Sequence, residues 1–369
     1  MQVTSTDYNF IKESGVHGRY LNLDMLKPLL LKWSKNFRVS ELGRSVLGEP
    51  VYRVTLGSGP IRILMWSQMH GNESTTTKAT LDLMSYLGSD GENASAILSA
   101  CTLTILPMLN PDGARAYTRT NAGEIDLNRD ARDLSQPESV ALRKEFERLE
   151  PHFCFNLHDQ RTIFSVGESP LPATVSFLAP AFDEMRSLSA SRKDSMKLIA
   201  AINQNLQQHI QGQVGRYDDT FNPNCVGDTF QALNSPTVLF EAGHSPEDYQ
   251  REQTRAHIFM ALLRSLEVIA SGEFKSYTVD GYFSIPENNK RFWDIIVRNP
   301  SALSRKWEEG ISLGIQFKEV LRENTILFQP QIEEAGFLKE KLGHAVFDCN
   351  READLKKIRG ISELFELLK

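Results

Sequence analysis

Three apolar runs in this chain each lead into a residue that can bind a metal ion or transfer a proton. Residues 61–66 are followed by His70-Gly71-Asn72-Glu73, residues 153–157 by His158, and residues 237–240 by Glu241. Short apolar runs bounded by polar residues are typical of buried strands. If the ends of these strands converge at one edge of a sheet, their polar residues form a single site. This arrangement favours a sheet protein that is covered by helices.

The residue types at these strand ends suit a zinc ion. Zinc accepts histidine nitrogen and carboxylate oxygen, and a catalytic zinc site has three protein ligands and one water. His70 and Glu73 supply two ligands, and His158 is the best candidate for the third because it ends a second apolar run. The alternative for His158 is a structural role, as a histidine that ends a strand without binding a metal. His152 follows Glu150-Pro151 in a turn and fits a ligand role less well.

Strand-like and helical patterns alternate up to about residue 272, and this alternation predicts an α/β fold. Beyond residue 272 the pattern changes to short strands that are broken by charged loops. We therefore expect a catalytic domain over residues 1–272 and a small, mostly β accessory domain over residues 273–369, ending in a short helix. The expected helices cover 74–87, 138–149, 192–210 and 246–270, and the expected strands include 51–56, 102–106, 277–285 and 325–329, with 51–56 forming a hairpin with the strand before His70.

The composition narrows the class of protein. With 369 residues, 41% of them hydrophobic, and a net charge of −6, the chain can bury a large core and gives no indication of nucleic-acid binding. Met1 to Tyr8 lacks the basic and apolar blocks of a signal peptide, and no apolar run is long enough to span a bilayer. We therefore expect a cytoplasmic protein without membrane contact, of unknown oligomeric state. Buried thiols are expected at Cys101, Cys154, Cys225 and Cys349, which form no Cys-x-x-Cys pair.

Two further polar segments join the first motif. Asn110-Pro111-Asp112-Gly113 is a turn sequence after a strand, and Asp126-Leu127-Asn128-Arg129 follows it. The order of His-x-x-Glu, Asn-Pro-Asp-Gly, an Asn-Arg pair, a distant His and then a Glu resembles the zinc carboxypeptidase family, the carboxypeptidase A-like metallopeptidases. The resemblance covers residues 40–270, and the short interval between Glu73 and His158 is more similar to the compact bacterial members. It implies a mixed, twisted central sheet flanked by helices and one Zn²⁺ per chain.

The resemblance assigns roles around the metal. It makes His70, Glu73 and His158 the zinc ligands, and Asp126 the carboxylate that accepts a hydrogen bond from the first zinc histidine. Glu241 matches the general base of the family. Zinc lowers the pKa of bound water from 15.7 toward roughly 7, and a nearby carboxylate can take the proton and return it to the leaving amine. The alternative for Glu241 is a residue that caps the next turn.

The resemblance also assigns the substrate contacts. Arg119 matches the arginine that polarises the scissile carbonyl, and Asn128 with Arg129 matches the pair that holds the substrate's terminal carboxylate. A planar guanidinium suits this role because it binds a carboxylate through two hydrogen bonds. Arg115 is an alternative to Arg119, and a surface salt bridge is the alternative for both.

Three positions are less defined. The family uses a mobile tyrosine before the catalytic glutamate, and Tyr217 is the nearest match here. Asp228 lies near the position of the family's side-chain pocket residue, where an acidic group would attract a basic side chain; the alternative is a loop or cap residue. His244 is close to the site in sequence and is either a spare polar group of the site or a structural residue.

These residues predict a zinc-dependent metallocarboxypeptidase that hydrolyses the C-terminal peptide or isopeptide bond of small peptides with a free terminal carboxylate. One alternative is an N-acyl amino acid deacylase resembling the aspartoacylase and succinylglutamate desuccinylase group, which shares His-Gly-Asn-Glu and an added C-terminal β domain. The intact Asn-Pro-Asp-Gly favours the peptidases. A third reading is a non-catalytic, zinc-dependent peptide-binding protein, against which the presence of every ligand and of Glu241 argues.

Overall fold

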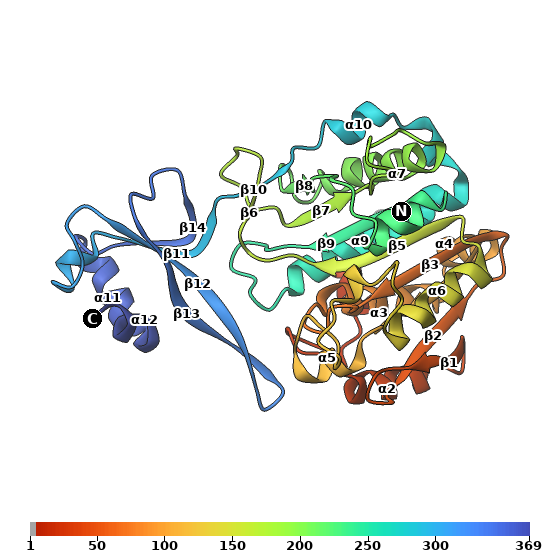
Figure 1. Cartoon of the computed structure of the whole chain (residues 1–369), viewed down its shortest axis with the longest axis horizontal. Coiled ribbons are helices and arrows are strands. Elements are labelled where there is room, and N and C mark those ends of the chain that lie inside the picture. The colour runs from red at the N-terminus through yellow and green to blue at the C-terminus, as the bar shows by residue number, and fades with distance from the viewer. Residues whose placement is uncertain (1–4) are drawn as a thin grey trace.

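The computed structural model describes residues 5–369, and its larger part is built on an eight-stranded mixed sheet (Figure 1). The strand order is β1-β2-β4-β3-β5-β9-β7-β8. The central strands β4, β3, β5 and β9 are parallel, whereas β1, β2 and β7 pair in antiparallel fashion with their neighbours nearer the centre. The predicted α/β class and mixed central sheet are confirmed. The strands are β1 (Arg38–Arg44), β2 (Pro50–Leu56), β3 (Ile61–Ser67), β4 (Cys101–Leu106), β5 (Phe153–Asp159), β7 (Val175–Leu178), β8 (Val214–Arg216) and β9 (Thr237–Ala242).

Helices cover both faces of this sheet, which explains why its central strands are mostly apolar rather than strictly alternating. All seven residues of β5 are buried. One face packs against α1 (Ser5–Ile11), α2 (Leu23–Trp33), α3 (Thr75–Leu87), α4 (Glu92–Ala100), α7 (Ala190–Leu206) and α9 (Glu252–Ser271). The other face packs against α6 (Pro137–Leu149) and α8 (Val226–Ala232).

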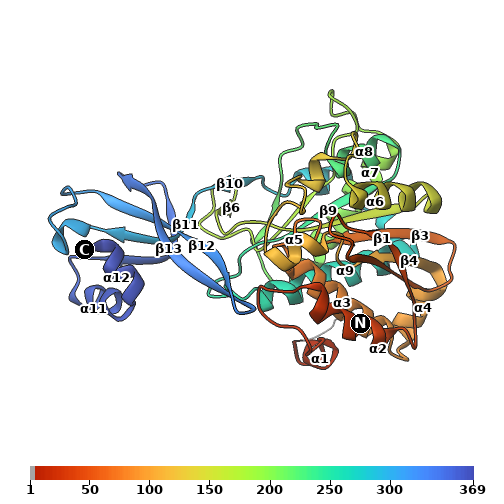
Figure 2. The same cartoon turned by 60° about the horizontal axis from the view of Figure 1, so that its bottom comes forward.

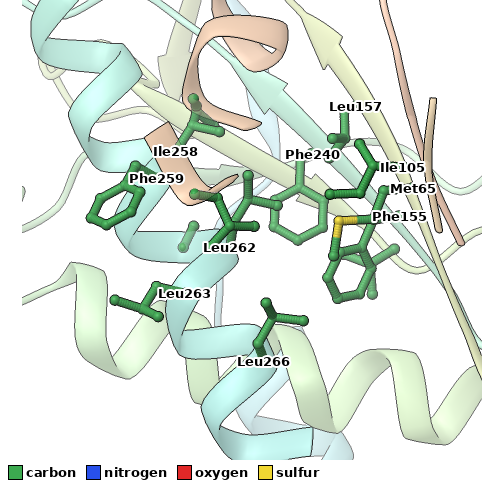
Figure 3. Packing of buried hydrophobic residues seen from close by; sticks show 14 of the residues in the cluster. Met65, Ile105, Phe155, Leu157, Phe240, Ile258, Phe259, Leu262, Leu263 and Leu266 are labelled. Atoms are coloured by element: carbon green, nitrogen blue, oxygen red, sulfur yellow. The ribbon is translucent and has the colours of Figure 1, made fainter. Parts of the chain in front are cut away.

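Helix α9 makes the central contact on the first face (Figure 3). Ile258, Leu262 and Leu266 follow each other at a spacing of four residues, so they lie on one side of the helix. Leu262 points toward Phe240 of β9, close to Phe155 of β5. The helical period of these apolar residues, read from the sequence, therefore corresponds to the packed side of the helix.

Two local predictions are wrong. Strand β2 does not form a hairpin with β3, because β4 lies between them and pairs with both. The loop after β2 instead packs against the end of α4, where the amide of Ser58 donates to the carbonyl of Leu98 over 3.0 Å. Residues 277–285 contain the short helix α10 (Val279–Phe283) in place of a strand, and this helix buries Tyr282.

A separate small sheet lies at the C-terminal end of the chain (Figure 2), as predicted. Its strand order is β13-β12-β11-β14, with β11 and β14 parallel. Two short helices cover it, and Ile358, Leu364 and Leu368 of these helices pack on Ile295 and Leu313. The elements are β11 (Phe292–Arg298), η3 (Pro300–Ala302), β12 (Ser312–Arg322), β13 (Thr325–Gly336), β14 (Leu342–Asp348), α11 (Glu352–Gly360) and α12 (Ser362–Leu368).

Residues 273–290 connect the two parts. The 3-10 helix η2 (Glu273–Ser276) and α10 contribute Phe274 and Tyr282 to the core of the larger part, and β10 (Asn288–Lys290) pairs with β6 (Phe164–Val166). The domain boundary between residues 272 and 273 stays a prediction, and this packing favours a boundary near the start of β11.

No helix within residues 5–369 is long and apolar enough to cross a membrane. The cytoplasmic location was predicted partly from Met1 to Thr4, which lie outside the described residues, and it stays a prediction.

Candidate active site

The predicted site residues lie at the carboxyl ends of β3, β5 and β9. From β3 the chain first forms β4 on one side and then returns to form β5 on the other side. Such a reversal of strand order opens a crevice at the ends of the strands, and ligands of α/β proteins bind there. The register of β5 and β9 sets His158 directly opposite Glu241.

The Asn-Pro-Asp-Gly segment supports the loop that carries His70. The side-chain amide of Asn110 donates to the carbonyl of Met69 over 3.1 Å, and its oxygen accepts from the amide of Gly113 over 2.8 Å. A Cβ atom on Gly71 would lie 1.9 Å from the carbonyl carbon of Gly113, so only glycine permits this approach. The segment therefore acts as a brace that fixes the position of His70.

The side chains of His70, Glu73 and His158 converge and are buried. The Nδ1 atom of His70 lies 2.9 Å from Oε1 of Glu73 and 3.1 Å from Nδ1 of His158, which lies 2.9 Å from Oε2 of Glu73. Ligand atoms of tetrahedral zinc, bound at about 2.0–2.1 Å, are separated by about 3.3 Å, so the group needs little expansion to hold the ion.

The hydrogen bond between His70 and Asp126 supports the same conclusion. Its Nε2 lies 2.9 Å from Oδ1 of Asp126, and a neutral imidazole that donates there presents an unprotonated Nδ1 to the carboxylate of Glu73. The lone pair on Nδ1 of His70 then faces a lone pair on Oε1 of Glu73 over 2.9 Å, and the two repel unless a cation lies between them. These three residues therefore fit a zinc ion, and Asp126 is placed to orient His70. Nε2 of His158 is buried and has no hydrogen-bond partner among residues 5–369.

Arg119 lies beside this cluster and is about half exposed. Its guanidinium contacts Asp126 over 3.0 Å and Glu73 over 3.4 Å. Although burial raises the pKa of Asp126, the hydrogen bond with His70 and the charge of Arg119 lower it below its usual range. Arg119 is thus held at the edge of the candidate metal site with part of its guanidinium facing the cavity.

Glu241 faces the same cavity from β9. Burial raises the pKa of its carboxyl well above the usual value, and the charges of Glu73 and Asp159 act in the same direction. Its Oε2 atom is buried and has no hydrogen-bond partner within the described part of the chain. A carboxylate with a raised pKa and a free oxygen can accept a proton and return it.

We call His70, Glu73 and His158 the metal-ligand group. A cavity of about 590 Å³ extends from this group to α8. Asn128 and Arg129 line it and lie in the 3-10 helix η1 (Leu127–Arg129), where the side chain of Asp126 accepts a hydrogen bond from the amide of Asn128. The side-chain oxygen of Asn128 accepts from the amide of Val226 over 3.2 Å, which ties η1 to the start of α8. The guanidinium of Arg129 remains exposed to the cavity, and Cys225 lies beside both residues. All four cysteines are free, and Cys101, Cys154 and Cys349 are buried as expected, whereas the expected burial is wrong for Cys225, which is partly exposed where it borders the cavity.

Asp228 and Tyr217 also line this cavity. Asp228 lies in the first turn of α8 and is 6% exposed, and burial raises the pKa of its carboxyl to about 6 despite the charges of Arg129 and Arg192. Its Oδ2 accepts from the amide of Asn222 over 3.1 Å, so it also acts as a loop cap. The ring of Tyr217 packs edge-on against Phe164 at 5.4 Å between centroids, and its pKa is raised by burial and by Glu241.

Three residues considered from the sequence lie outside the site. Arg115 pairs with Asp24 over 2.7 Å at the surface, and His152 accepts a hydrogen bond from the amide of Arg62 over 3.0 Å. His244 is buried at the contact with the C-terminal sheet, where its ring lies 4.2 Å from that of His344. The structure therefore favours a surface salt bridge as the role of Arg115 and a structural role for His244.

Asp159 is a site residue that the sequence analysis missed. Its amide donates to Oε2 of Glu73 over 3.1 Å, and its carboxylate accepts from the amides of Thr75 and Thr76 at the start of α3. A negative side chain at a helix N-terminus is favourable, so Asp159 fixes the loop with Glu73 relative to β5. The one feature of the sequence that could have indicated a role for Asp159 is its position directly after His158.

The comparisons with known proteins point to one family. The zinc carboxypeptidase family model matches residues 23–224. Probable carboxypeptidase 2 of Trichophyton verrucosum is 28% identical over 102 residues, which are 28% of this chain and 20% of that protein. Carboxypeptidase 2 of Trichophyton rubrum is also 28% identical over 102 residues, or 19% of its length. The match thus spans about a fifth of the length of these curated relatives.

Solved structures share the fold of the larger part. A metallo-carboxypeptidase from Burkholderia cenocepacia has a TM-score of 0.56 at 19% identity, covering 69% of this chain and 70% of that one. A metallo-carboxypeptidase from Pseudomonas aeruginosa in complex with (2-guanidinoethylmercapto)succinic acid has a TM-score of 0.52 at 17% identity, covering 71% and 70%. Because the family model covers more than half of its 369 residues, this chain belongs to the zinc carboxypeptidase family.

Proposed function

We propose that the protein is a zinc-dependent carboxypeptidase that removes the C-terminal residue of short peptides through hydrolysis of a peptide or isopeptide bond. The observation that carries the proposal is that one cavity contains a His-Glu-His group, a free carboxylate and an exposed arginine. These groups correspond to a metal site, a proton acceptor and a carboxylate anchor. We assign one zinc per chain to His70, Glu73 and His158.

The chain supplies the proton transfer and the charge stabilisation. Zinc, when bound, supplies a Lewis acid that lowers the pKa of water at the site. Glu241, with its unpaired Oε2, takes a proton from the attacking water and returns it to the leaving amine. Arg119 donates hydrogen bonds to the oxygen of the scissile carbonyl as negative charge develops, and a fixed donor of this kind contributes about 3–4 kcal/mol. Asp126 orients both His70 and Arg119.

We assign the cavity beyond the metal group to the substrate's C-terminal residue. Arg129 binds its terminal carboxylate, and Asn128 holds η1 in place for this contact. Asp228 accepts a basic side chain at the inner end of the cavity, and Tyr217 closes over the residue. The Pseudomonas aeruginosa relative supports this assignment, because the compound in its complex combines a guanidino group with a succinic acid.

The anchor is tested with a peptide as the free acid and as the amide. We expect wild type to cleave the acid with a kcat/KM at least about tenfold higher, because a charge-assisted hydrogen bond contributes about 1.5–3 kcal/mol. Arg129→Ala should lose most of this preference. Arg132→Ala, which changes an exposed arginine three positions away, should keep it. Equal cleavage of acid and amide by wild type would refute the anchor and indicate an endopeptidase.

The same assay separates the peptidase from the deacylase alternative. A carboxypeptidase cleaves a tripeptide with a free carboxylate, whereas a deacylase hydrolyses an N-acylated amino acid and leaves the tripeptide intact. The family match favours the peptidase. A non-catalytic peptide-binding protein would bind the tripeptide and turn over neither compound, with or without added zinc.

A further inference from the structure

A second cavity of about 350 Å³ adjoins the first at the metal-ligand group. Glu73, Arg119 and Arg161 line both cavities, so the two form one cleft that passes the candidate metal site. Under the proposed function the first cavity takes the C-terminal residue. The part of the substrate on the N-terminal side of the scissile bond then extends into the second cavity, which we name the acyl-side cavity.

The C-terminal sheet supplies one wall of the acyl-side cavity through Phe317 and Glu319 of β12. Glu319 forms an ion pair with Arg19 over 2.9 Å and accepts a hydrogen bond from the hydroxyl of Tyr117. The ring of Phe317 packs edge-on against Tyr249 at 5.2 Å between centroids. The β12–β13 hairpin, which extends from the C-terminal sheet toward the larger part (Figure 2), therefore belongs to the cleft.

The carboxylates that line the acyl-side cavity all have partners. Glu73 belongs to the metal-ligand group, and Asp159 is bound by amides at the start of α3. Glu319 is paired with Arg19, which is itself 6% exposed. Two nitrogen atoms of Arg19, Nε and Nη1, remain buried without a hydrogen-bond partner in the described part of the chain. Each of these acidic side chains therefore already has an ion-pair or hydrogen-bond partner.

Two arginines on this cavity form no ion pair with a carboxylate of the described residues. Arg251 is 1% exposed and makes no ion pair among residues 5–369; it donates to the backbone carbonyls of Gln160, Ala242 and Gly243, and its Nε is unpartnered. Burial and the charge of Arg19 lower the pKa of Arg251, and the charges of nearby carboxylates, Asp159 and Glu319 among them, only partly offset this shift. Arg161 is exposed and has no hydrogen bond or ion pair in the described chain.

We propose that the acyl-side cavity binds a carboxylate on the substrate, so that the preferred peptide carries an acidic side chain on the residue just before the scissile bond. Arg161 is the contact residue, because its guanidinium has no partner in the described part of the chain and its side chain lines the cavity, and the buried Arg251 adds positive potential there. A guanidinium binds a carboxylate through two charge-assisted hydrogen bonds. This specificity rests on the proposed function, since it assumes that the substrate crosses the candidate metal site.

The test compares two N-acetylated tripeptides, Ala-Glu-Lys and Ala-Gln-Lys, which differ only in the charge of the middle residue. Binding is measured by calorimetry on the zinc-loaded Glu241→Gln variant, and hydrolysis is measured on wild type. We expect the Glu peptide to bind about tenfold more tightly. Adding Arg161→Ala should reduce this ratio to less than about threefold, whereas adding Arg305→Ala, an exposed arginine of the C-terminal sheet domain, should preserve it.

Equal affinity for the two peptides, no binding of either, or a ratio that survives Arg161→Ala would each overturn the inference. The outcome for the proposed function is separate. If the Glu241→Gln variant prefers the Glu peptide and wild type hydrolyses neither peptide, the acidic specificity stands and the carboxypeptidase activity fails. If wild type hydrolyses both peptides and the variant binds them equally, the activity stands and the acidic specificity fails.

Discussion

Asp228 offers a test that separates a functional carboxylate from a structural one. The side chain is 6% exposed, and its pKa is raised to about 6 because burial disfavours the charged form. Arg129 and Arg192 lower the pKa but do not compensate the burial. At neutral pH the folded protein therefore holds a charge at a cost in stability. We expect Asp228→Asn to increase the free energy of unfolding at neutral pH while it weakens binding of basic C-terminal residues.

The size of the expected change in the free energy of unfolding follows from the pKa shift of Asp228. An aspartate in the unfolded chain has a pKa of about 3.9, so folding raises it by about 2 units, which corresponds to about 3 kcal/mol. Because the pKa is raised in the folded state, the favourable contribution of Asp228 is present below about pH 4 and is lost as the pH rises through about 6. The stability advantage of Asp228→Asn should therefore be small at pH 4 and grow by about 2–3 kcal/mol by pH 7.

Urea unfolding of the metal-free proteins, followed by tryptophan fluorescence between pH 4 and 8, measures this difference. Working without metal removes the contribution of zinc binding to stability. Asp133→Asn, which changes an exposed carboxylate, serves as the matched control. A difference that is constant with pH, or a variant that is less stable than wild type at pH 8, would refute the reasoning and leave Asp228 as a structural cap of the Asn222 loop.

The remaining predictions concern the metal and the proton. Elemental analysis should find about one zinc per chain in wild type and much less in His70→Ala, whereas the exposed His152→Ala should keep its zinc; full occupancy in His70→Ala would remove His70 from the ligands. Glu241→Gln should keep its zinc and lose about two to four orders of magnitude in turnover, with the exposed Glu247→Gln as control. Activity of Glu241→Gln within a few-fold of wild type would show that another group is the base.

The parts of the fold that were predicted correctly are those with strong local signals. Residues 153–157 are apolar except for Asn156 because β5 is covered on both faces, and α9 shows a clear helical period. The β2–β3 hairpin was predicted wrongly because the partner of β2 is β4, which follows more than forty residues later. Segment 277–285 is too short for the pattern of apolar residues to distinguish a strand from a helix. The chain forms the helix α10 there, which buries Tyr282.

The metal-ligand group was predictable for a related reason. His70 and Glu73 are three residues apart in one loop, and His158 ends a strand, so both are marked by the apolar runs before them. The sequence does not determine which imidazole nitrogens face each other. That depends on Asp126, 56 positions after His70, whose carboxylate accepts the Nε2 hydrogen bond. Which nitrogen of His70 faces Glu73 and His158 therefore depends on tertiary contacts and cannot be read from the local sequence.

The acyl-side cavity could not be predicted, because no two of its walls are close in sequence. Arg19 and Glu319 pair across 300 positions. A buried arginine such as Arg251 has the same sequence signature whether it braces backbone carbonyls or faces a ligand. Read from the sequence, residues 273–369 are an accessory domain, since their strands give no sign of contact with the metal-ligand loops. The ion pair of Glu319 and the packing of Phe317 on Tyr249 instead make β12 a wall of the cleft. If the acidic specificity holds, the C-terminal sheet is therefore part of substrate recognition, and changes in β12 alter substrate choice without touching a metal ligand.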